Sequence, residues 1–272
     1  MTIKLIALDM DGTTLNNEHQ ITPENQQAIA KAQQKGIEIV VSTGRSNTEM
    51  NALWEIFPQV RYFSCSNGSK IYDKTRQCNI FEDLLPFEPA LEILTLLKEF
   101  DVFPEIYAET QIYAEQYYYE NASDYINPEF EELIKITRTP VENLSDFLSR
   151  RQIPVEKINA FFLKPELRKQ IIKKCSRMNV AITNALGINI EMNSATASKG
   201  NALQHLCQKL AIAPQEVMAI GDGSNDISML EFAGCSIAME NAVPEVKAAA
   251  KFTTGKNIDS GVAAAIYQYA LQ

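Results

Sequence analysis

The sequence predicts an α/β fold in which a doubly wound, Rossmann-like parallel sheet is interrupted by an inserted α/β domain. Near both ends of the chain, short apolar runs alternate with helical stretches, which is typical of a parallel sheet. Between residues 84 and 188 the rhythm changes to clustered strands and helices, which indicates a second domain. We therefore assign residues 1–83 and 189–272 to the core and residues 84–188 to the insertion.

The first strand–helix–strand unit is expected over residues 5–41. Residues 5–8 form a short apolar strand; Thr22 and Pro23 then start a helix that Gly36 ends, and residues 37–41 form the next strand. A connection of this length makes the two strands parallel and adjacent. A helix over about 47–57, a strand over 60–65 and a hairpin from 71–72 and 79–81 follow.

The rest of the chain divides between the insertion and the second half of the core. The insertion is expected to contain helices near 88–100 and 166–177, and strands near 102–107, 111–114, 157–163 and 180–183. The core pattern resumes at 188–191. It continues with strands over 217–220 and 235–239. Helices are expected over 198–210, 244–250 and 259–271, and another follows residues 221–226 and ends at 232.

Composition and charge exclude several classes of partner. The net charge of −9 argues against a broad nucleic-acid-binding face, and no apolar run is long enough to span a membrane. Five scattered cysteines and two histidines favour free thiols over disulfides or a zinc site. The N-terminus has no secretory pattern. We expect a cytoplasmic protein, a monomer or weak homodimer, with no nucleic-acid or membrane partner.

Two carboxylates, Asp9 and Asp11, stand where the first strand ends. In an extended chain, residues two apart point the same way, so both can face one small volume before Gly12 turns the chain. Two like charges held this close need a cation or a shared proton. The alternative interpretation is a solvated acidic turn.

Residues 42–45 follow the second strand and bring together a hydroxyl, a glycine and a guanidinium. Thr43, Gly44 and Arg45 precede a helix, and the backbone N–H groups of such a helix start favour an anion. A simple capped helix start is the alternative.

Lys199 opens a later helix, against the tendency of the helix dipole, so it is more readily explained by a ligand than by the helix itself. A solvated surface lysine is the alternative. The strand over 217–220 is followed by Asp222, Asn225 and Asp226. These residues are either a second acidic group of the site or part of a glycine-rich turn.

All four stretches are expected at the carboxyl edge of the sheet, where open doubly wound sheets bind ligands. Several acids with hard oxygens, and no histidine or cysteine among them, indicate Mg²⁺. A lysine, a hydroxyl and helix-start amides beside that ion indicate a phosphoryl group.

In these stretches the sequence resembles the haloacid dehalogenase (HAD) superfamily of phosphohydrolases. Asp9-Met10-Asp11-Gly12-Thr13 is similar to its first motif, Thr43-Gly44 to its second, Lys199 to its third, and residues 221–226 to its fourth. The insertion between the second and third motifs is similar to the subclass IIB cap, and the chain to the Cof type. Thr14 departs from the usual apolar residue. Because all residues assigned to chemistry lie outside the insertion, we expect the cap to supply specificity and closure.

The resemblance also implies a role for each residue. Asp9 attacks phosphorus, and Asp11 protonates the leaving oxygen and later activates water. Mg²⁺ is held by the Asp9 and Asp222 carboxylates and the Asp11 backbone carbonyl, while Asp226 contacts the metal or orients Lys199. The phosphoryl oxygens are bound by Met10, Thr43, Gly44, Lys199, Asn225 and, less clearly, Arg45.

The leading hypothesis is a Mg²⁺-dependent phosphatase for small phosphorylated metabolites, above all sugar phosphates. A phosphomutase-type phosphotransferase remains open, because the same core supports it when basic residues of the cap grip a second phosphate. A non-catalytic phosphate sensor is the third possibility, although the presence of both Asp9 and Asp11 argues against it.

Overall fold

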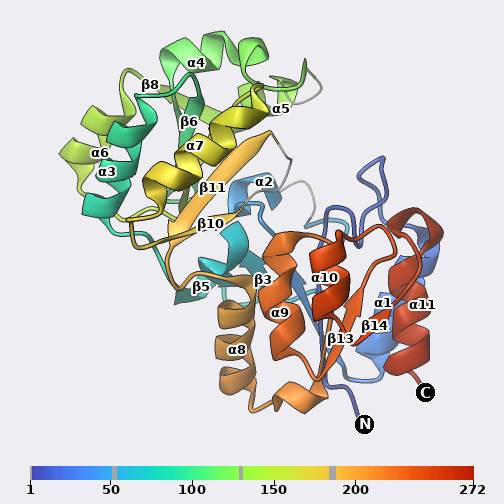
Figure 1. Ribbon diagram of the computed structural model, residues 1–272. Coiled ribbons are helices and arrows are strands. Elements are labelled where there is room, and N and C mark those ends of the chain that lie inside the picture. The colour runs from blue at the N-terminus through green and yellow to red at the C-terminus, as the bar shows by residue number, and fades with distance from the viewer. Residues whose placement is uncertain (1, 51–53, 129–130, 184–187) are drawn as a thin grey trace. The chain divides into compact units, whose positions relative to one another are not determined.

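The computed structural model describes residues 2–50, 54–128, 131–183 and 188–272. By their contacts these form two units, shown in Figure 1. The core unit comprises Met1–Gly44, Ala52–Glu82 and Ser198–Gln272, and the inserted unit comprises Arg45–Asn51 and Asp83–Ala197. Within the described ranges, no helix is long and apolar enough to cross a membrane.

The core unit is built on a sheet whose strand order is β14-β13-β12-β1-β2-β3-β4-β5. The strands from β14 to β3 are parallel, and β4 and β5 form an antiparallel hairpin at one edge. Their bounds are β1 Leu5–Leu8, β2 Glu38–Ser42, β3 Tyr62–Cys65, β4 Lys70–Asp73, β5 Cys78–Glu82, β12 Val217–Gly221, β13 Cys235–Ala238 and β14 Phe252–Thr253. The expected β-α-β unit and hairpin are both confirmed.

The helices of the core fall into two groups because the chain moves outward from β1 in both directions. Right-handed crossovers that run in opposite directions place their helices on opposite faces of the sheet. In Figure 1, α1 lies with α11, and α8, α9 and α10 lie together. Their bounds are α1 Pro23–Gln34, α8 Lys199–Leu210, α9 Ile227–Phe232, α10 Pro244–Ala249 and α11 Gly261–Tyr269.

Local signals explain where these helices start. The Thr22 hydroxyl accepts a hydrogen bond from the Asn25 amide, and Pro23 occupies the first turn of α1, as expected. At the start of α8, the Ser198 hydroxyl accepts from the Asn201 amide, which fixes the backbone just before Lys199. Short 3₁₀ turns connect the remaining segments: η1 Ser66–Gly68, η4 Pro214–Glu216, η5 Ser224–Asp226 and η6 Asn257–Asp259.

The direction of the winding reverses between β12 and β1. These two strands pair in parallel, with Leu8 opposite Ile220, so the residues that follow them emerge side by side. The Asp9 amide continues the ladder by donating to the Ile220 carbonyl at 3.1 Å. A crevice outside the carboxyl ends of strands at such a point is where doubly wound sheets bind ligands.

The inserted unit has a second, mixed sheet with the order β10-β11-β9-β6-β7-β8. Its strands are β6 Phe103–Ala108, β7 Gln111–Glu115, β8 Arg138–Val141, β9 Lys157–Phe161, β10 Val180–Thr183 and β11 Asn189–Ser194. Its helical segments are α2 Asn47–Met50, α3 Phe87–Leu97, α4 Gln116–Glu120, η2 Ala122–Asp124, α5 Glu131–Thr137, α6 Leu144–Arg151 and α7 Pro165–Cys175.

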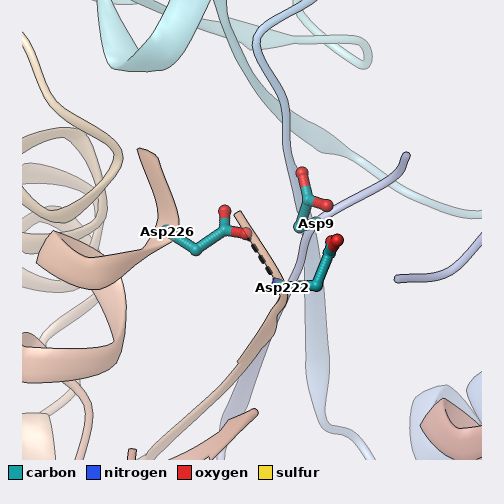
Figure 2. Close-up of side chains that lie close together, drawn as sticks. All are labelled: Asp9, Asp222 and Asp226. Carbon is teal, nitrogen blue, oxygen red and sulfur yellow. Dashed lines mark hydrogen bonds between the residues drawn. The ribbon is translucent and has the colours of Figure 1, made fainter. Parts of the chain in front are cut away.

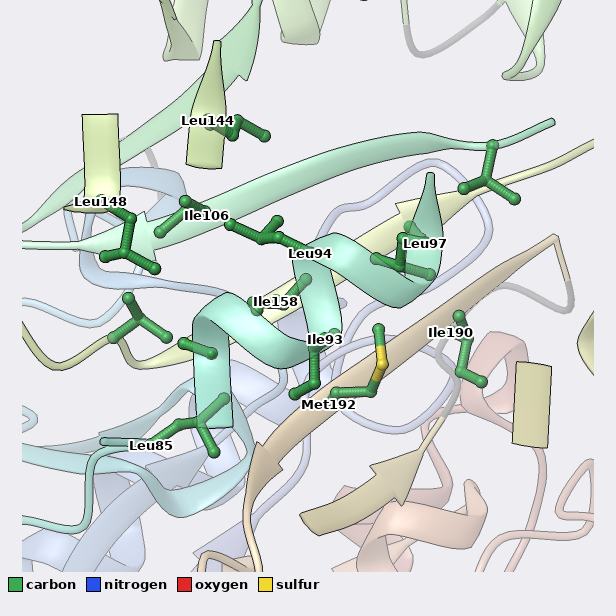
Figure 3. Close-up of a cluster of buried hydrophobic side chains, with 14 of the residues drawn as sticks. Leu85, Ile93, Leu94, Leu97, Ile106, Leu144, Leu148, Ile158, Ile190 and Met192 are labelled. Atoms are coloured by element: carbon green, nitrogen blue, oxygen red, sulfur yellow. The ribbon is translucent and has the colours of Figure 1, made fainter. Parts of the chain in front are cut away.

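Alternation along the strands gives this second sheet one apolar face. Ile106 and Ile158 lie in a cluster with Ile93, Leu94 and residues of α6, as Figure 3 shows. The residues that alternate with these isoleucines along the strands, such as Glu105 and Lys157, belong to the opposite face and are also buried. The second face is therefore mixed: it carries these charges beside a smaller apolar cluster that includes Phe103 and Phe161, and the charges need partners within the protein.

Two assignments of the sequence analysis are corrected by this arrangement. Residues 189–197, expected in the core, belong to the inserted unit: β11 pairs with β9 and β10, and Ile190 and Met192 lie in its apolar cluster (Figure 3). The alternation of Asn189, Glu191 and Asn193 with these apolar residues is typical of a strand with one polar face, not of a central parallel strand.

The second correction concerns residues 45–51, which the sequence analysis placed in the core. They group with the inserted unit. The helix expected over about 47–57 is shorter, because α2 ends at Met50 and residues 54–57 are not helical; residues 51–53 lie outside the described residues. The sequence analysis also missed β8 and α4–α6, which are short.

Candidate active site

Three carboxylates meet at the point where the sheet reverses direction. Asp9 follows β1, and Asp222 and Asp226 follow β12; one oxygen from each lies within 4.8 Å of the others. Figure 2 shows Asp9 and Asp222 next to each other, with the Asp226 carboxylate directed at the backbone of Asp222. The register of the two parallel strands thus brings together acids from the two ends of the sequence.

Lys199 neutralises part of this charge. Its ammonium lies 2.6 Å from an oxygen of Asp9 and 2.6 Å from an oxygen of Asp226, and its side chain is fully buried. The Ser198 cap at the start of α8 fixes the backbone that carries it. Lys199 is therefore not a solvated surface lysine, and its service to a ligand stays a prediction.

Both carboxylate oxygens of Asp226 accept hydrogen bonds. One oxygen accepts from Lys199, and the other accepts from the amides of Asp222 and Gly223, each at 2.9 Å. The carboxylate therefore closes the turn that carries Asp222 and holds the lysine at the same time. These contacts favour an orienting role over direct metal binding.

Asp222 is positioned by the first motif. Its carboxylate accepts a hydrogen bond from the Thr13 hydroxyl at 2.7 Å. Gly12 has a φ of +78°, and a Cβ at this position would lie 2.4 Å from an Asp222 oxygen. Glycine is thus required here both for the turn and for the approach of the second acid.

The carboxyl groups are perturbed as expected for crowded acids. Burial raises the pKa of Asp9 well above its usual value, and Asp226 and Asp222 add to this effect while Lys199 opposes it. Burial raises the pKa of Asp222 to about 6, against the hydrogen bond from Thr13. Burial alone would lower the pKa of Lys199, but Asp226 and Asp9 outweigh it and raise the pKa.

These groups fit a divalent cation. Lys199 pairs with two of these three buried or partly buried carboxylates, those of Asp9 and Asp226, so the cluster keeps excess negative charge in a small volume. Their donor atoms are all carboxylate oxygens, the ligands that Mg²⁺ and Ca²⁺ prefer. A cation next to Asp9 and Asp222 would offset the burial and the repulsion that raise their pKa values.

The expected phosphate-binding residues of the core lie beside these acids in the sheet order. Thr43 follows β2; its amide donates to Ser64 and its carbonyl accepts from the Asn67 amide at 3.1 Å. A Cβ on Gly44 would lie 2.9 Å from the Asn67 side chain and 3.7 Å from that of Asn225. The side-chain amide of Asn225 in turn donates to the side-chain oxygen of Asn67 at 3.1 Å.

Asn67 and Thr13 are site residues that the sequence analysis did not assign. Asn67 is buried and has a φ of +58°, a left-handed conformation that asparagine tolerates. It links the loops after β2 and β12. The signal was present in the Asn67-Gly68 turn at the end of a strand, but turn chemistry alone explains such a dipeptide.

Asp11 is separated from the cluster of three acids. The chain leaves the extended conformation at Met10, so the alternation that would align Asp11 with Asp9 ends there. The Asp11 side chain is about half exposed, at 43%, and one oxygen lies 3.6 Å from Nδ1 of His19. Met10 is buried, and its carbonyl accepts the amides of Thr13 and Thr14. Arg45 belongs to the inserted unit.

Known proteins of similar sequence and structure extend across the whole chain. Residues 6–266 match the model of a family of haloacid dehalogenase-like hydrolases. The 5-amino-6-(5-phospho-D-ribitylamino)uracil phosphatase YcsE of Bacillus subtilis is 32% identical, over 99% of this chain and 96% of its own. The pyridoxal phosphate phosphatase YbhA of Escherichia coli is 27% identical, over 99% of both chains. A solved haloacid dehalogenase-like hydrolase from B. subtilis superposes with a TM-score of 0.87, at 29% identity, over 98% of this chain and 100% of its own.

Proposed function

We propose that this chain, which belongs to the haloacid dehalogenase-like hydrolase family and is a phosphoric monoester hydrolase, acts through a covalent phosphoryl-Asp9 intermediate with the help of Mg²⁺. The observation that carries the proposal is the position of Asp9 at the end of β1, 2.6 Å from Lys199 and beside Asp222. A buried carboxylate with a fixed cation at its side is suited to attack an anionic ester.

Asp9 has two oxygens with different tasks in this proposal. One is held by Lys199, which fixes the carboxylate, and the other would approach phosphorus in line. The attack forms a bond from the Asp9 oxygen to phosphorus and breaks the bond from phosphorus to the ester oxygen. Water then attacks the phosphorus atom and restores the carboxylate, so inorganic phosphate leaves.

Mg²⁺ would be held by the carboxylates of Asp9 and Asp222 and the backbone carbonyl of Asp11, as the oxygen donors and excess negative charge of the cluster suggest. When bound, it supplies positive charge that offsets the repulsion between the nucleophile and the phosphoryl oxygens. Asp226 would act indirectly, by fixing Lys199 and the turn that carries Asp222.

Asp11 is the acid–base residue of the proposal. It would donate a proton to the leaving oxygen and then accept one from the attacking water. Its exposed carboxyl group is compatible with this task, because such a group exchanges protons with solvent between the two steps. Met10, Thr43, Gly44 and Asn225 would hold the phosphoryl oxygens through backbone or side-chain N–H and O–H groups, joined by Arg45 if its side chain reaches them.

The proposed substrates are small phosphorylated metabolites, with sugar phosphates as the first class to test. This choice is supported by relatives named for a phosphoribityl compound and for pyridoxal phosphate, both small molecules with a phosphate ester. The YcsE substrate carries its phosphate on a sugar-like ribityl chain, which is the chemistry that a sugar phosphate shares.

The direct test is hydrolysis of a panel of phosphate esters by the purified protein, with Mg²⁺ and after exhaustive chelation. We expect Mg²⁺-dependent release of phosphate, fastest from sugar phosphates or other polyol phosphates. A phosphomutase would instead convert a sugar phosphate into its isomer without net phosphate release. Full activity after chelation would contradict the proposed metal.

A further inference from the structure

A segment of the inserted unit follows directly on the proposed phosphate-binding residues Thr43 and Gly44. The chain leaves the core unit between Gly44 and Arg45, and residues 54–82 belong to the core unit again. Thr43 is anchored on its own side by Ser64 and by the Asn67 amide. The part of the loop that follows Gly44 is anchored by the carboxylate of Glu49, a residue of α2.

One oxygen of Glu49 closes the turn that follows Arg45. It accepts hydrogen bonds from the Ser46 amide at 2.9 Å and from the Ser46 hydroxyl at 3.1 Å. The Met50 amide then donates to the Ser46 carbonyl at 2.9 Å, which completes a single helical turn. Glu49 thus determines the backbone conformation two residues beyond Gly44.

The other oxygen of Glu49 lies 3.3 Å from Nη1 of Arg138, the first residue of β8. Both side chains are largely removed from solvent, with 12% of Glu49 and 3% of Arg138 exposed. An ion pair shielded in this way is screened far less than a surface pair. Because Glu49 also holds Ser46, its ion pair with Arg138 links the loop after Gly44 to the sheet of the inserted unit.

Arg138 is itself held rigidly. Its Nε and Nη2 atoms donate to the two oxygens of the fully buried Glu105, at 2.7 and 3.2 Å. The Nη2 atom also donates to the Tyr107 hydroxyl at 3.1 Å. A bidentate pair fixes the plane of the guanidinium, so the direction in which Nη1 faces Glu49 is fixed as well.

Charge explains why this arrangement persists. Burial alone would raise the pKa of Glu49, but Arg138, Lys157 and the Ser46 hydrogen bonds together lower it below its ordinary value. The carboxylate is thus charged at neutral pH and needs its partner, because an unpaired buried charge is strongly unfavourable.

We propose that Arg138 is a positioning residue for the phosphate-binding loop and that it acts through Glu49 and Ser46 on Thr43 and Gly44. The proposal rests on the proposed function, in which these two residues hold phosphoryl oxygens. Its consequence is that the Glu49–Arg138 pair sets the affinity for the phosphoryl group more than the rate of the chemical step, which Asp9 and Asp11 govern.

The main variant is Glu49→Gln, which keeps the shape and an acceptor oxygen but removes the charge. It leaves Arg138 paired with Glu105, so the inserted unit should fold. We expect KM for p-nitrophenyl phosphate and the inhibition constant of inorganic phosphate to rise together by roughly three- to tenfold, with kcat within about twofold. The Mg²⁺ affinity should not change.

Glu216→Gln provides a matched control. One oxygen of Glu216 also accepts the amide three residues before it, that of Ala213 at 3.0 Å, and the other pairs with a cation, Lys4, at 2.7 Å. Glu216 precedes β12 and so lies at the end of the strand opposite Asp222. Its substitution should leave both KM and the phosphate inhibition constant unchanged.

Arg138→Met and the double variant with Glu49→Gln decide whether the effect passes through the arginine. We expect Arg138→Met to raise KM as Glu49→Gln does, and the double variant to raise it no further, because the two residues act as one unit. Arg138→Met leaves the buried Glu105 with hydrogen bonds from Tyr107 and Asn159 but without a cation, so Arg138→Lys serves in its place if the methionine variant does not fold. Hydrogen exchange of the peptide that contains Ser46 reports the loosened turn without reference to activity.

Two outcomes overturn the inference. Either the exchange at Ser46 rises in Glu49→Gln while KM and the phosphate inhibition constant stay unchanged, or Glu49→Gln raises KM and the arginine variants do not. In the second case Glu49 acts only as a local cap. A wild-type protein that hydrolyses no phosphate ester would instead refute the proposed function, and is recognised before any variant is made.

Discussion

At the scale of single residues, the two acids of the first motif occupy different environments. Asp9 is buried next to Lys199, whereas Asp11 is exposed and faces His19. A nucleophile benefits from a fixed, dry position, and a proton donor benefits from access to solvent. The difference in exposure therefore matches the difference in their proposed roles.

Asp9→Asn tests the nucleophile. We predict that kcat for any phosphate ester falls at least about a thousandfold, because the amide cannot form the acyl phosphate. The fold should persist, since asparagine still accepts a hydrogen bond from Lys199 and one of the crowded charges is removed. Steady-state kinetics and circular dichroism check both statements; near wild-type turnover would refute the assignment.

Asp11→Asn tests the acid–base residue. We predict a loss of roughly 10²- to 10⁴-fold for alkyl phosphates, whose leaving oxygen needs a proton. The formation of the intermediate from nitrophenyl phosphate should be affected least, because nitrophenolate leaves unprotonated. The measurement is the pre-steady-state rate of nitrophenol release, compared with that of alcohol release. An equal loss for both leaving groups would count against this role.

The affinity for Mg²⁺ should depend on pH through Asp222. Burial raises the pKa of this carboxyl group to about 6, so it is protonated below that pH, and the ion can bind only after the proton leaves. The dissociation constant should therefore rise at least about tenfold for each pH unit below 6, because the raised pKa of Asp9 adds a second proton that the ion must displace. Calorimetric titrations between pH 5 and 8 measure it, and a constant affinity over this range would contradict the prediction.

At the scale of elements, close packing between a turn and a helix positions Lys199. Gly68 ends the turn η1 with a φ of +91°, and a Cβ there would lie 2.2 Å from the Ser198 carbonyl, directly before Lys199. The sequence showed the strand, the turn and the helix, since their signals are local. It could not show that the turn packs on the helix start, because that contact depends on the tertiary fold.

Gly68→Ala tests this packing, with Gly36→Ala as its control. Both glycines have positive φ, but a Cβ on Gly36 meets nothing within 4 Å. We predict that Gly36→Ala lowers the free energy of unfolding by about 1 kcal/mol through backbone strain alone, and Gly68→Ala by at least about 2 kcal/mol more. The fluorescence of the single tryptophan, Trp54 of the core unit, follows urea unfolding. Equal losses would show that the contact with Ser198 is not tight.

The same limit explains which parts of the site could be predicted from sequence. Asp9, Asp222 and Lys199 follow strands or open a helix, so a parallel sheet alone predicts that they meet. The link from Asn225 to Asn67 and the ion pair of Glu49 with Arg138 join loops and strands whose pairing no local pattern reveals. The position of β11 was missed for a related reason: alternation indicates a strand with one polar face, but it does not say which of the two sheets the strand joins.

At the scale of the whole molecule, each unit has its own sheet, and the three clustered acids and Lys199 all belong to the core unit. A ligand that binds only the folded core stabilises the core by mass action. The inserted unit has its own cluster of apolar residues, shown in Figure 3, and gains nothing directly from the metal.

We therefore predict that Mg²⁺ raises the urea midpoint reported by Trp54 but not the midpoint of β6 and β9 in the inserted unit. At 100 times its dissociation constant, the ion should stabilise the core by about 2.7 kcal/mol. Hydrogen exchange of β6 and β9 amides across a urea series measures the second midpoint. Equal shifts at both sites would mean that the two units unfold as one.

The stereochemical course at phosphorus tests the central claim most directly. A phosphate ester made chiral at phosphorus with oxygen isotopes and sulfur is hydrolysed in labelled water, and the configuration of the released thiophosphate is determined. Transfer to Asp9 followed by hydrolysis consists of two in-line displacements, so the account predicts net retention. Net inversion would show that water attacks the substrate directly, and would contradict a covalent intermediate on Asp9.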